Sequence, residues 1–187
     1  NILLVMTFIP LIGMTTLGLN IVPEIDLSFN NALTTKEIRD SIDIERMEKA
    51  LKINTYFYER SMPLTGYGMQ FVLVAEKYGI PYNLLPAIAI RESSGGKRLL
   101  NNNPFGWGSA LIKFDDFNHA IEIVGKNLGG ANPKTASYYA YKDIKKKLYY
   151  YNGTIIKNYE DQVIDIMNKI DKTEIAEDTV SIYKNNL

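Results

Sequence analysis

The sequence YNLLPAIAIRESSGG, at positions 82–96, predicts a helix that ends on a glutamate. Asn83 is the expected N-cap, and the residues that follow it are mostly apolar. Leu85, Ile88 and Glu92 share one face of this helix, because residues spaced i, i+3 and i+7 lie one above another. We therefore expect the side chain of Glu92 to face the protein interior or a cleft.

From the sequence alone, we expect the surroundings of Glu92 to favour its protonated form. Desolvation by an apolar helix disfavours the charged carboxylate, and the negative end of the helix dipole disfavours it again. Cleavage of a glycosidic bond needs such a carboxylic acid, which gives its proton to the leaving oxygen and then acts as a base. The alternative is a glutamate whose carboxylate extends past the helix end into solvent.

A second segment, NNNPFGWG at positions 101–108, has the composition of a ligand-binding loop. Amides such as that of Asn103 bind the hydroxyl and acetamido groups of sugars, aromatic rings offer a face to a pyranose, and glycines let a ligand approach the backbone. Phe105 and Trp107 have an alternative role, which is to hold the loop on the hydrophobic core.

The amino-acid composition limits the kinds of partner and of catalytic or metal site that this protein is expected to have. The 187 residues are 46% hydrophobic and 22% charged, which suits one globular domain with appended ends. Twenty-one basic residues balance 21 acidic ones, so nucleic acid is not an expected partner. With no cysteine and a single histidine, His119, thiolate and histidine metal sites and Ser/His/Asp triads are disfavoured. We expect no metal and no cofactor, and assign the chemistry to carboxylates and tyrosines.

The first 22 residues, NILLVMTFIPLIGMTTLGLNIV, contain no charge. Their length fits a membrane span of roughly 20 residues or the apolar part of a signal peptide. A buried core helix is the alternative. We expect export or membrane anchoring, and hence a location outside the cytoplasm.

The rest of the chain has mostly helical periodicity, so the predicted class is mainly α. Residues 23–60 are expected to form a linker to about residue 35 and then a helix with Ile44, Met47, Leu51 and Tyr58 on one face. Residues 61–171 are the expected main domain, and 172–187 a polar tail. Further helices are predicted from Gly66 to Gly79, from Asn118 to Leu128, over the tyrosine-rich segment 138–151, and from Asn158, with Asp161 completing a capping box. Residues 113–117 are expected to form a short strand or a turn.

The motif ESSGGK at 92–97, followed by NNNPFGWG, resembles the signature of the lysozyme-like superfamily. It is most similar to that of flagellar-autolysin-type endo-β-N-acetylglucosaminidases, which is roughly Glu-Ser-Gly-Trp-Gly-Lys, a gap, then Asn-Asn-Leu-Phe-Gly. The preceding KYGIPYNLLPAIAI is similar to the lead-in helix of that group and of lytic transglycosylases. Three positions depart from the pattern, which are Gly95 for tryptophan, Pro104 for leucine and Trp107 for an aliphatic residue.

This resemblance covers about residues 62–170 and implies a lysozyme-like helical domain with a short hairpin or loop beside an active-site cleft. It implies that Glu92 is the catalytic acid and that the cleft binds peptidoglycan or a related N-acetylglucosamine polymer. Tyr151 or Tyr159 would lie near the acid, and both are candidate catalytic residues. The residues expected to bind substrate are Ser93, Ser94, Asn103, Phe105, Gly106 and Trp107.

For the second catalytic group, the sequence offers more than one candidate. Asp116, or its neighbour Asp115, would activate water if carried to the site by a hairpin, and the alternative is that both cap the following helix. The resemblance to lytic transglycosylases offers another route, because those enzymes use one glutamate and a hydroxyl of the substrate itself as nucleophile. Two rival functions remain, a non-catalytic glycan-binding module and a membrane-anchored interaction protein.

Overall fold

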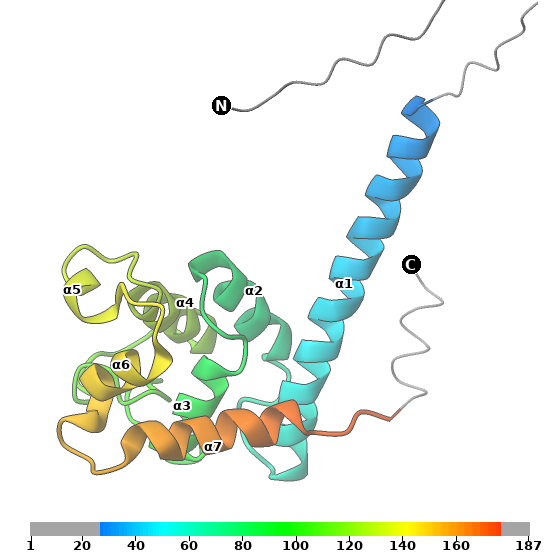
Figure 1. Ribbon diagram of the computed structural model, residues 1–187. Helices are drawn as coiled ribbons and strands as arrows, with labels where there is room; N and C mark the ends of the chain where they lie inside the picture. The colour runs from blue at the N-terminus through cyan, green and yellow to red at the C-terminus, as the bar shows by residue number, and fades with distance from the viewer. Residues whose placement is uncertain (1–26, 177–187) are drawn as a thin grey trace, which may run out of the picture.

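The computed structural model describes residues 27–176, and the central element in it is the helix α3 (Leu84–Ser93). Figure 1 shows α3 inside a group of helices, and it contacts α2 (Gly68–Tyr78), α4 (Phe117–Leu128) and α7 (Tyr159–Asp171). Five of its ten residues are apolar side chains with no exposed surface. The remaining elements are α1 (Leu27–Glu59), α5 (Ala136–Tyr139), α6 (Ile144–Leu148) and a π-helix, η1 (Tyr149–Gly153).

The prediction of a mainly helical protein is confirmed, and the described residues contain no strand. Residues 94–116, between α3 and α4, form turns and a loop, so the segment 113–117 is not a strand. The loop is closed by backbone and side-chain bonds, since Phe114 N–H donates to Asn101 O and the Asn102 amide donates to Phe114 O. The sequence left open whether a hairpin or a loop lies beside the site, and the structure contains a loop there.

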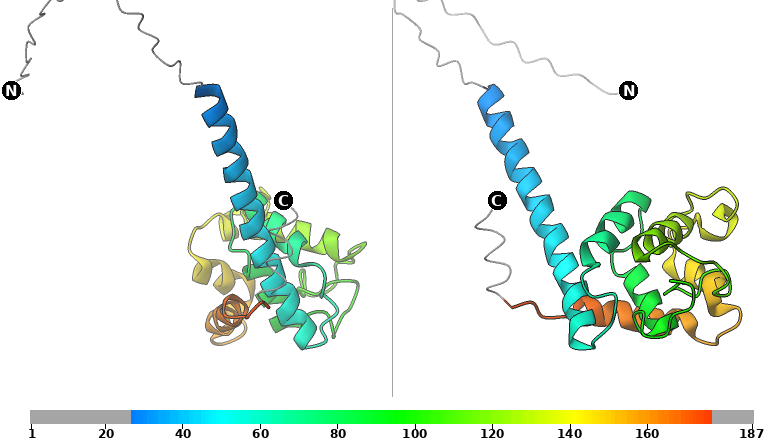
Figure 2. Two further views of the ribbon diagram at one scale, coloured as in Figure 1. Left: turned by 90° about the vertical axis from the view of Figure 1, so that its right-hand side faces the viewer. Right: turned by 180° about the vertical axis from the view of Figure 1, so that it is seen from behind.

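Helix α1 is longer than the sequence predicts. The linker expected to about residue 35 is already helical from Leu27, and neither proline nor glycine interrupts residues 27–59. The N-terminal part of α1 extends away from the other helices (Figures 1 and 2), while its C-terminal part packs against α2 and α7. At the α1–α2 crossing Gly68 is required, since a Cβ there would lie 2.2 Å from Ala50 O.

The buried face of α1 also differs from the predicted one. Ala50, Ile53 and Phe57 are buried, whereas Tyr58 is 75% exposed and Ile44 only partly covered. The apolar spacing does not show which residues meet α2 and α7, and α1 contacts these helices only in its second half.

The tyrosine-rich segment 138–151 is not one helix. It contains the end of α5, an extended link, α6 and the start of η1. Asp143 explains the break, because its carboxylate accepts hydrogen bonds from Lys145 N–H and Lys146 N–H and so begins a new helix.

Two predicted caps are not formed by side chains. Asn83 precedes α3, but its amide donates to Met167 O of α7, 3.2 Å away. Asn158 precedes α7 with φ +59°, a left-handed conformation that does not direct its side chain to the helix N–H groups, and Asp161 pairs with Lys145 instead. By contrast Asp116 caps α4, accepting from His119 N–H at 2.8 Å.

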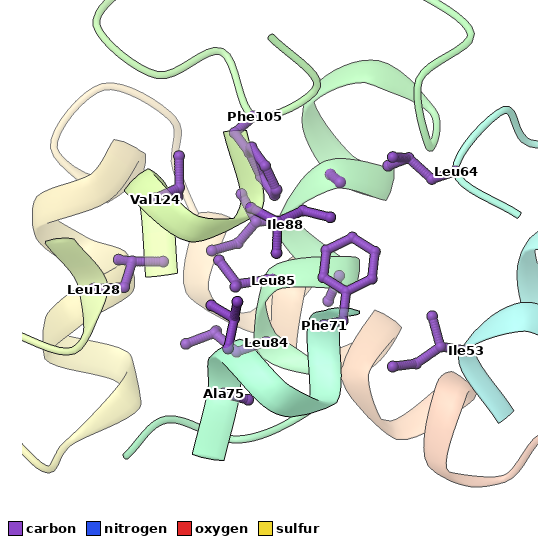
Figure 3. Packing of buried hydrophobic residues seen from close by; sticks show 14 of the residues in the cluster. Ile53, Leu64, Phe71, Ala75, Leu84, Leu85, Ile88, Phe105, Val124 and Leu128 are labelled. Carbon is purple, nitrogen blue, oxygen red and sulfur yellow. The ribbon is translucent and has the colours of Figure 1, made fainter. Parts of the chain in front are cut away.

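The core is a single cluster to which all the larger helices contribute. Figure 3 shows Ile88 of α3 between Phe71 of α2 and Val124 of α4, with Phe105 of the loop entering the same cluster. Helix α7 adds Val163 and Ile170 to it. This shared core fixes the loop and the ends of α3 and α7 relative to one another.

The predicted segment 1–22 lies outside the described residues, as do residues 177–187 of the predicted tail. Within residues 27–176, none of the helices is both long and apolar enough to cross a membrane.

Candidate active site

Glu92 lies in the last turn of α3 and lines a cleft of about 670 Å³. The helix stops directly after it, because Ser94 is left-handed with φ +54° and its neighbour Gly95 has φ +65°. A side chain at Gly95 would meet Met62, with a Cβ 2.5 Å from the sulfur, which explains why no tryptophan occupies this position. The other residues of the cleft are Phe105, Gly106, Trp107, Gly108, Ser109, Ala110, Tyr139, Tyr151, Asn152 and Ile155.

One oxygen of the Glu92 carboxyl group accepts two hydrogen bonds. The hydroxyl of Tyr159 donates to Oε1 at 2.6 Å, and the side-chain amide of Asn152 donates to the same oxygen at 3.4 Å. Both donors come from the C-terminal part of the chain. They fix the orientation of the carboxyl group, and among the described residues no hydrogen bond occupies Oε2.

Gly106 lies against the unoccupied oxygen. A Cβ built on Gly106 would be 3.2 Å from Glu92 Oε2, and the residue has φ +63°, which side chains rarely adopt. Glycine therefore meets two requirements at once, the left-handed turn and the space in front of the carboxyl group.

Trp107 forms the aromatic wall of the cleft with two tyrosines. Its ring centroid is 5.6 Å from that of Tyr151 and 5.8 Å from that of Tyr139. Tyr151 stacks on Tyr159 with an interplanar angle of 8°, and its hydroxyl donates to Phe105 O at 2.6 Å. The wall is thus connected to the loop and to the residue that holds Glu92.

The two tyrosines of the wall and Tyr159, which bonds to Glu92, keep their protons. Burial raises the pKa of Tyr151 well above its ordinary value, and the nearby Glu92 raises it further. Burial is also the largest cause of the raised pKa of Tyr159, followed by the influence of Tyr151 and Glu92. Burial raises the pKa of Tyr139 to about 12. At neutral pH all three hydroxyl groups are donors, not anions.

Asn103 is buried and acts inside the loop, where sequence analysis expected it to contact substrate. Its amide donates to Trp107 O at 2.8 Å and to Ile112 O at 3.3 Å, and its oxygen accepts from Trp107 N–H at 3.0 Å. These three bonds leave little capacity for a sugar. Asn103 positions Trp107.

Two further expected contacts are internal. Phe105 has no exposed surface and its ring belongs to the core (Figure 3), so its alternative role as an anchor of the loop is the correct one. Ser93 is buried, with its hydroxyl donating to Ala89 O and accepting from Gly96 N–H. Ser94 is partly exposed at the helix end but does not line the cleft.

Asp116 is exposed, and its carboxylate caps α4. Asp115 pairs with His119 at 2.9 Å. Neither aspartate lines the cleft, in which Glu92 is the one carboxylate among the described residues. Within those residues there is also no group of three or more His, Asp or Glu side chains able to hold a metal ion.

Sequence reasoning missed two residues of the site, Asn152 and Tyr139. Asn152 directly follows Tyr151, so its position in the sequence was a usable signal. Tyr139 belongs to the tyrosine-rich segment 138–151, which was predicted to be one continuous helix, and nothing in the sequence distinguished it from the other tyrosines there.

Comparisons with protein-family models, with curated proteins and with solved structures find no match to this chain.

Proposed function

We propose that this protein cleaves β-1,4 glycosidic bonds of N-acetylglucosamine-containing cell-wall glycan, with Glu92 as the general acid. One observation carries the proposal, which is the placement of the Glu92 carboxyl group in a cleft of about 670 Å³ with an aromatic wall. The resemblance of ESSGGK and NNNPFGWG to the lysozyme-like superfamily supports the same activity.

The two carboxyl oxygens have different roles in this mechanism. Oε1 is held by Tyr159 and Asn152, so Oε2, beside Gly106, is the oxygen that meets the glycosidic oxygen. In the protonated state Oε2 donates the proton to the departing sugar. The resulting carboxylate then accepts a proton from the attacking group.

The wall of the cleft suits a sugar. The ring of Trp107, packed against the buried Tyr139, offers an apolar face to the C–H groups of a pyranose, and the backbone of residues 106–110 offers peptide groups to hydroxyl and acetamido substituents. Among the described residues, no basic side chain lines the cleft, which agrees with an uncharged glycan backbone as ligand.

A second candidate, lytic transglycosylase activity, is favoured by the single carboxylate of the cleft. Activation of water for inversion needs a second carboxylate on the opposite face of the sugar, and retention needs one as nucleophile. Asp116 does not supply it. An attack by a hydroxyl group of the substrate itself needs only Glu92, first as acid and then as base.

We place the activity outside the cytoplasmic membrane, with the protein membrane-anchored or secreted. The support is the uncharged segment 1–22 and the location of the substrate. We propose no nucleic-acid partner and no cofactor.

The test is digestion of purified peptidoglycan by the full chain, with mass spectrometry of the fragments. New reducing ends are expected from hydrolysis, and the sugar at each new end identifies the bond. Anhydro ends would establish the transglycosylase. Binding to peptidoglycan without any fragments would overturn the proposal in favour of a non-catalytic glycan-binding module.

A further inference from the structure

Three exposed tyrosines lie together next to the cleft, and we call Tyr138, Tyr149 and Tyr150 the tyrosine platform. Tyr150 is in its middle, with its ring centroid 5.5 Å from that of Tyr138 and 5.6 Å from that of Tyr149. Their exposed fractions are 51%, 49% and 37% for Tyr138, Tyr149 and Tyr150. Single exposed aromatic residues are ordinary, but a group of them in contact indicates a binding surface.

The platform is continuous with the aromatic wall of the cleft. Tyr138 contacts Tyr139 at 6.4 Å between ring centroids, and Tyr139 contacts Trp107 at 5.8 Å. An unbroken series of rings therefore leads from the cleft to the surface. The rings come from α5 and η1, which are separate in sequence and brought to the same end of the molecule as α6 (Figure 1).

A fourth tyrosine packs against the platform. Tyr141 stacks on Tyr150 with ring centroids 6.3 Å apart and an interplanar angle of 19°, and the ammonium group of Lys146 lies 3.6 Å from the centre of the Tyr141 ring. Tyr149 and Tyr150 begin the π-helix, an element that is rare in proteins and frequent at functional sites.

A hollow of about 500 Å³ lies beside Tyr149 and Tyr150. Its other lining residues are all polar, namely Asp143, Lys145, Lys146, Asn158, Glu160 and Asp161. Three acidic and two basic side chains nearly cancel, so neither a polyanion nor a polycation is favoured. Aromatic faces next to donors and acceptors of balanced charge are what a hydroxyl-rich neutral ligand requires.

We propose that the tyrosine platform and this hollow bind a further stretch of the same glycan strand, outside the cleft. The proposal rests on the proposed function for the identity of the polymer. Its occupant is a polysaccharide because the platform continues the cleft's own aromatic wall and because the hollow beside it is polar and nearly neutral. The surface thus favours long strands over short fragments.

The experiment measures co-sedimentation of the full chain with insoluble peptidoglycan and, separately, with chitin, a pure N-acetylglucosamine polymer. The variants carry Glu92→Gln, so that cleavage does not consume the polymer. Replacing Tyr149→Ala and Tyr150→Ala together is expected to weaken binding at least about fivefold. Tyr138→Ala, on a different element, is expected to weaken it in the same direction.

Two controls separate the platform from general effects. Tyr58→Ala removes an exposed tyrosine of α1 that makes no ring contact within residues 27–176, and it is expected to leave binding unchanged. Tyr149→Phe with Tyr150→Phe keeps the rings and is expected to retain binding, with circular dichroism verifying the fold. Unchanged binding of both the double alanine variant and Tyr138→Ala, or an equal loss in Tyr58→Ala, would overturn the platform.

Cleavage of peptidoglycan by the otherwise unchanged chain is measured in parallel. If the platform variants lose binding while the chain with Glu92 intact does not cleave, the proposed function fails and the platform stands as a glycan-binding surface. If the chain with Glu92 intact cleaves and the platform variants bind as tightly as the Glu92→Gln chain with an unaltered platform, the platform fails and the proposed function stands.

Discussion

The hydroxyl of Tyr159 donates a hydrogen bond to Oε1 of Glu92 across 2.6 Å. Tyr159 is the first residue of α7 and has no exposed surface, and Glu92 lies in the last turn of α3. The bond joins two helix ends that are 67 residues apart in sequence. It links the packing of the core directly to the orientation of the proposed acid.

Tyr159→Phe tests that bond. The ring and its stacking on Tyr151 remain, but the carboxyl group loses its shorter hydrogen bond, so we expect peptidoglycan cleavage to slow by roughly tenfold or more. The melting temperature should change little. Tyr58→Phe, on an exposed tyrosine, is the matched control. A Tyr159→Phe variant that cleaves at the wild-type rate would show that this bond does not position the acid.

Gly106→Ala tests the space in front of Glu92, and Gly79→Ala is its control. Both glycines are left-handed, with φ +63° and +64°, so each alanine variant should lose about 1 kcal/mol of stability. A Cβ at Gly79 meets no atom within 4 Å, whereas one at Gly106 lies 3.2 Å from Glu92 Oε2. Chemical denaturation should therefore give similar losses, while cleavage should fall only in Gly106→Ala. Equal cleavage by both variants would contradict the assignment of Oε2 to the cleft.

Asn103→Ala tests the internal role of the buried amide. The variant leaves the backbone groups of Trp107 and Ile112 without their partner, so we expect a loss of about 2–3 kcal/mol in the free energy of unfolding. Binding to chitin should weaken as well, because Trp107 is no longer held in the wall. Asn118→Ala, at an exposed position of α4, should change neither quantity. A stable Asn103→Ala variant that loses only glycan binding would instead support direct contact with the sugar.

The raised pKa of Tyr139 leads us to expect a loss of stability at alkaline pH. Its pKa is 10.0 when exposed and about 12 when buried, so above pH 10 the unfolded chain releases this proton while the folded chain keeps it. The free energy of unfolding should therefore decrease as the pH rises from 10 toward 12, by up to about 1.4 kcal/mol per pH unit for this group. Tyr139→Phe should reduce the slope, as measured by urea unfolding across this range. An identical slope in the variant would show that Tyr139 is not protected by the fold.

The sequence predicts the central part of this structure well because local and tertiary preferences agree there. The apolar spacing before Glu92 is that of a helix, and the same residues fill the core, so Leu85 and Ile88 are buried as expected. In other parts of the chain, a contact with a residue distant in sequence determines the local structure. The Asn83 amide bonds to α7 instead of capping α3, and nothing near it in sequence indicates this.

The candidate site was predictable to a similar extent. The position of Glu92 at a helix end follows from the spacing of the apolar residues. The presence of Gly106 near it is indicated by the NNNPFGWG motif. The polar and aromatic contacts do not, because Asn103 and Phe105 look like ligand-binding residues until the fold shows that both are buried. Asn152 directly follows Tyr151 in the sequence, but its contact with Glu92 depends on the π-helix, which the periodicity of the sequence does not predict.

The central claim is that Glu92 donates the proton that breaks the glycosidic bond, and Glu92→Gln tests it most directly. The amide keeps the size of the side chain and an oxygen for the Tyr159 hydroxyl, but it has no acidic proton to give. We expect fragment release from peptidoglycan to fall by a factor of about 10² to 10⁴, with unchanged circular dichroism and retained binding to the polymer. Fragment release at the wild-type rate by a folded Glu92→Gln variant would contradict the account.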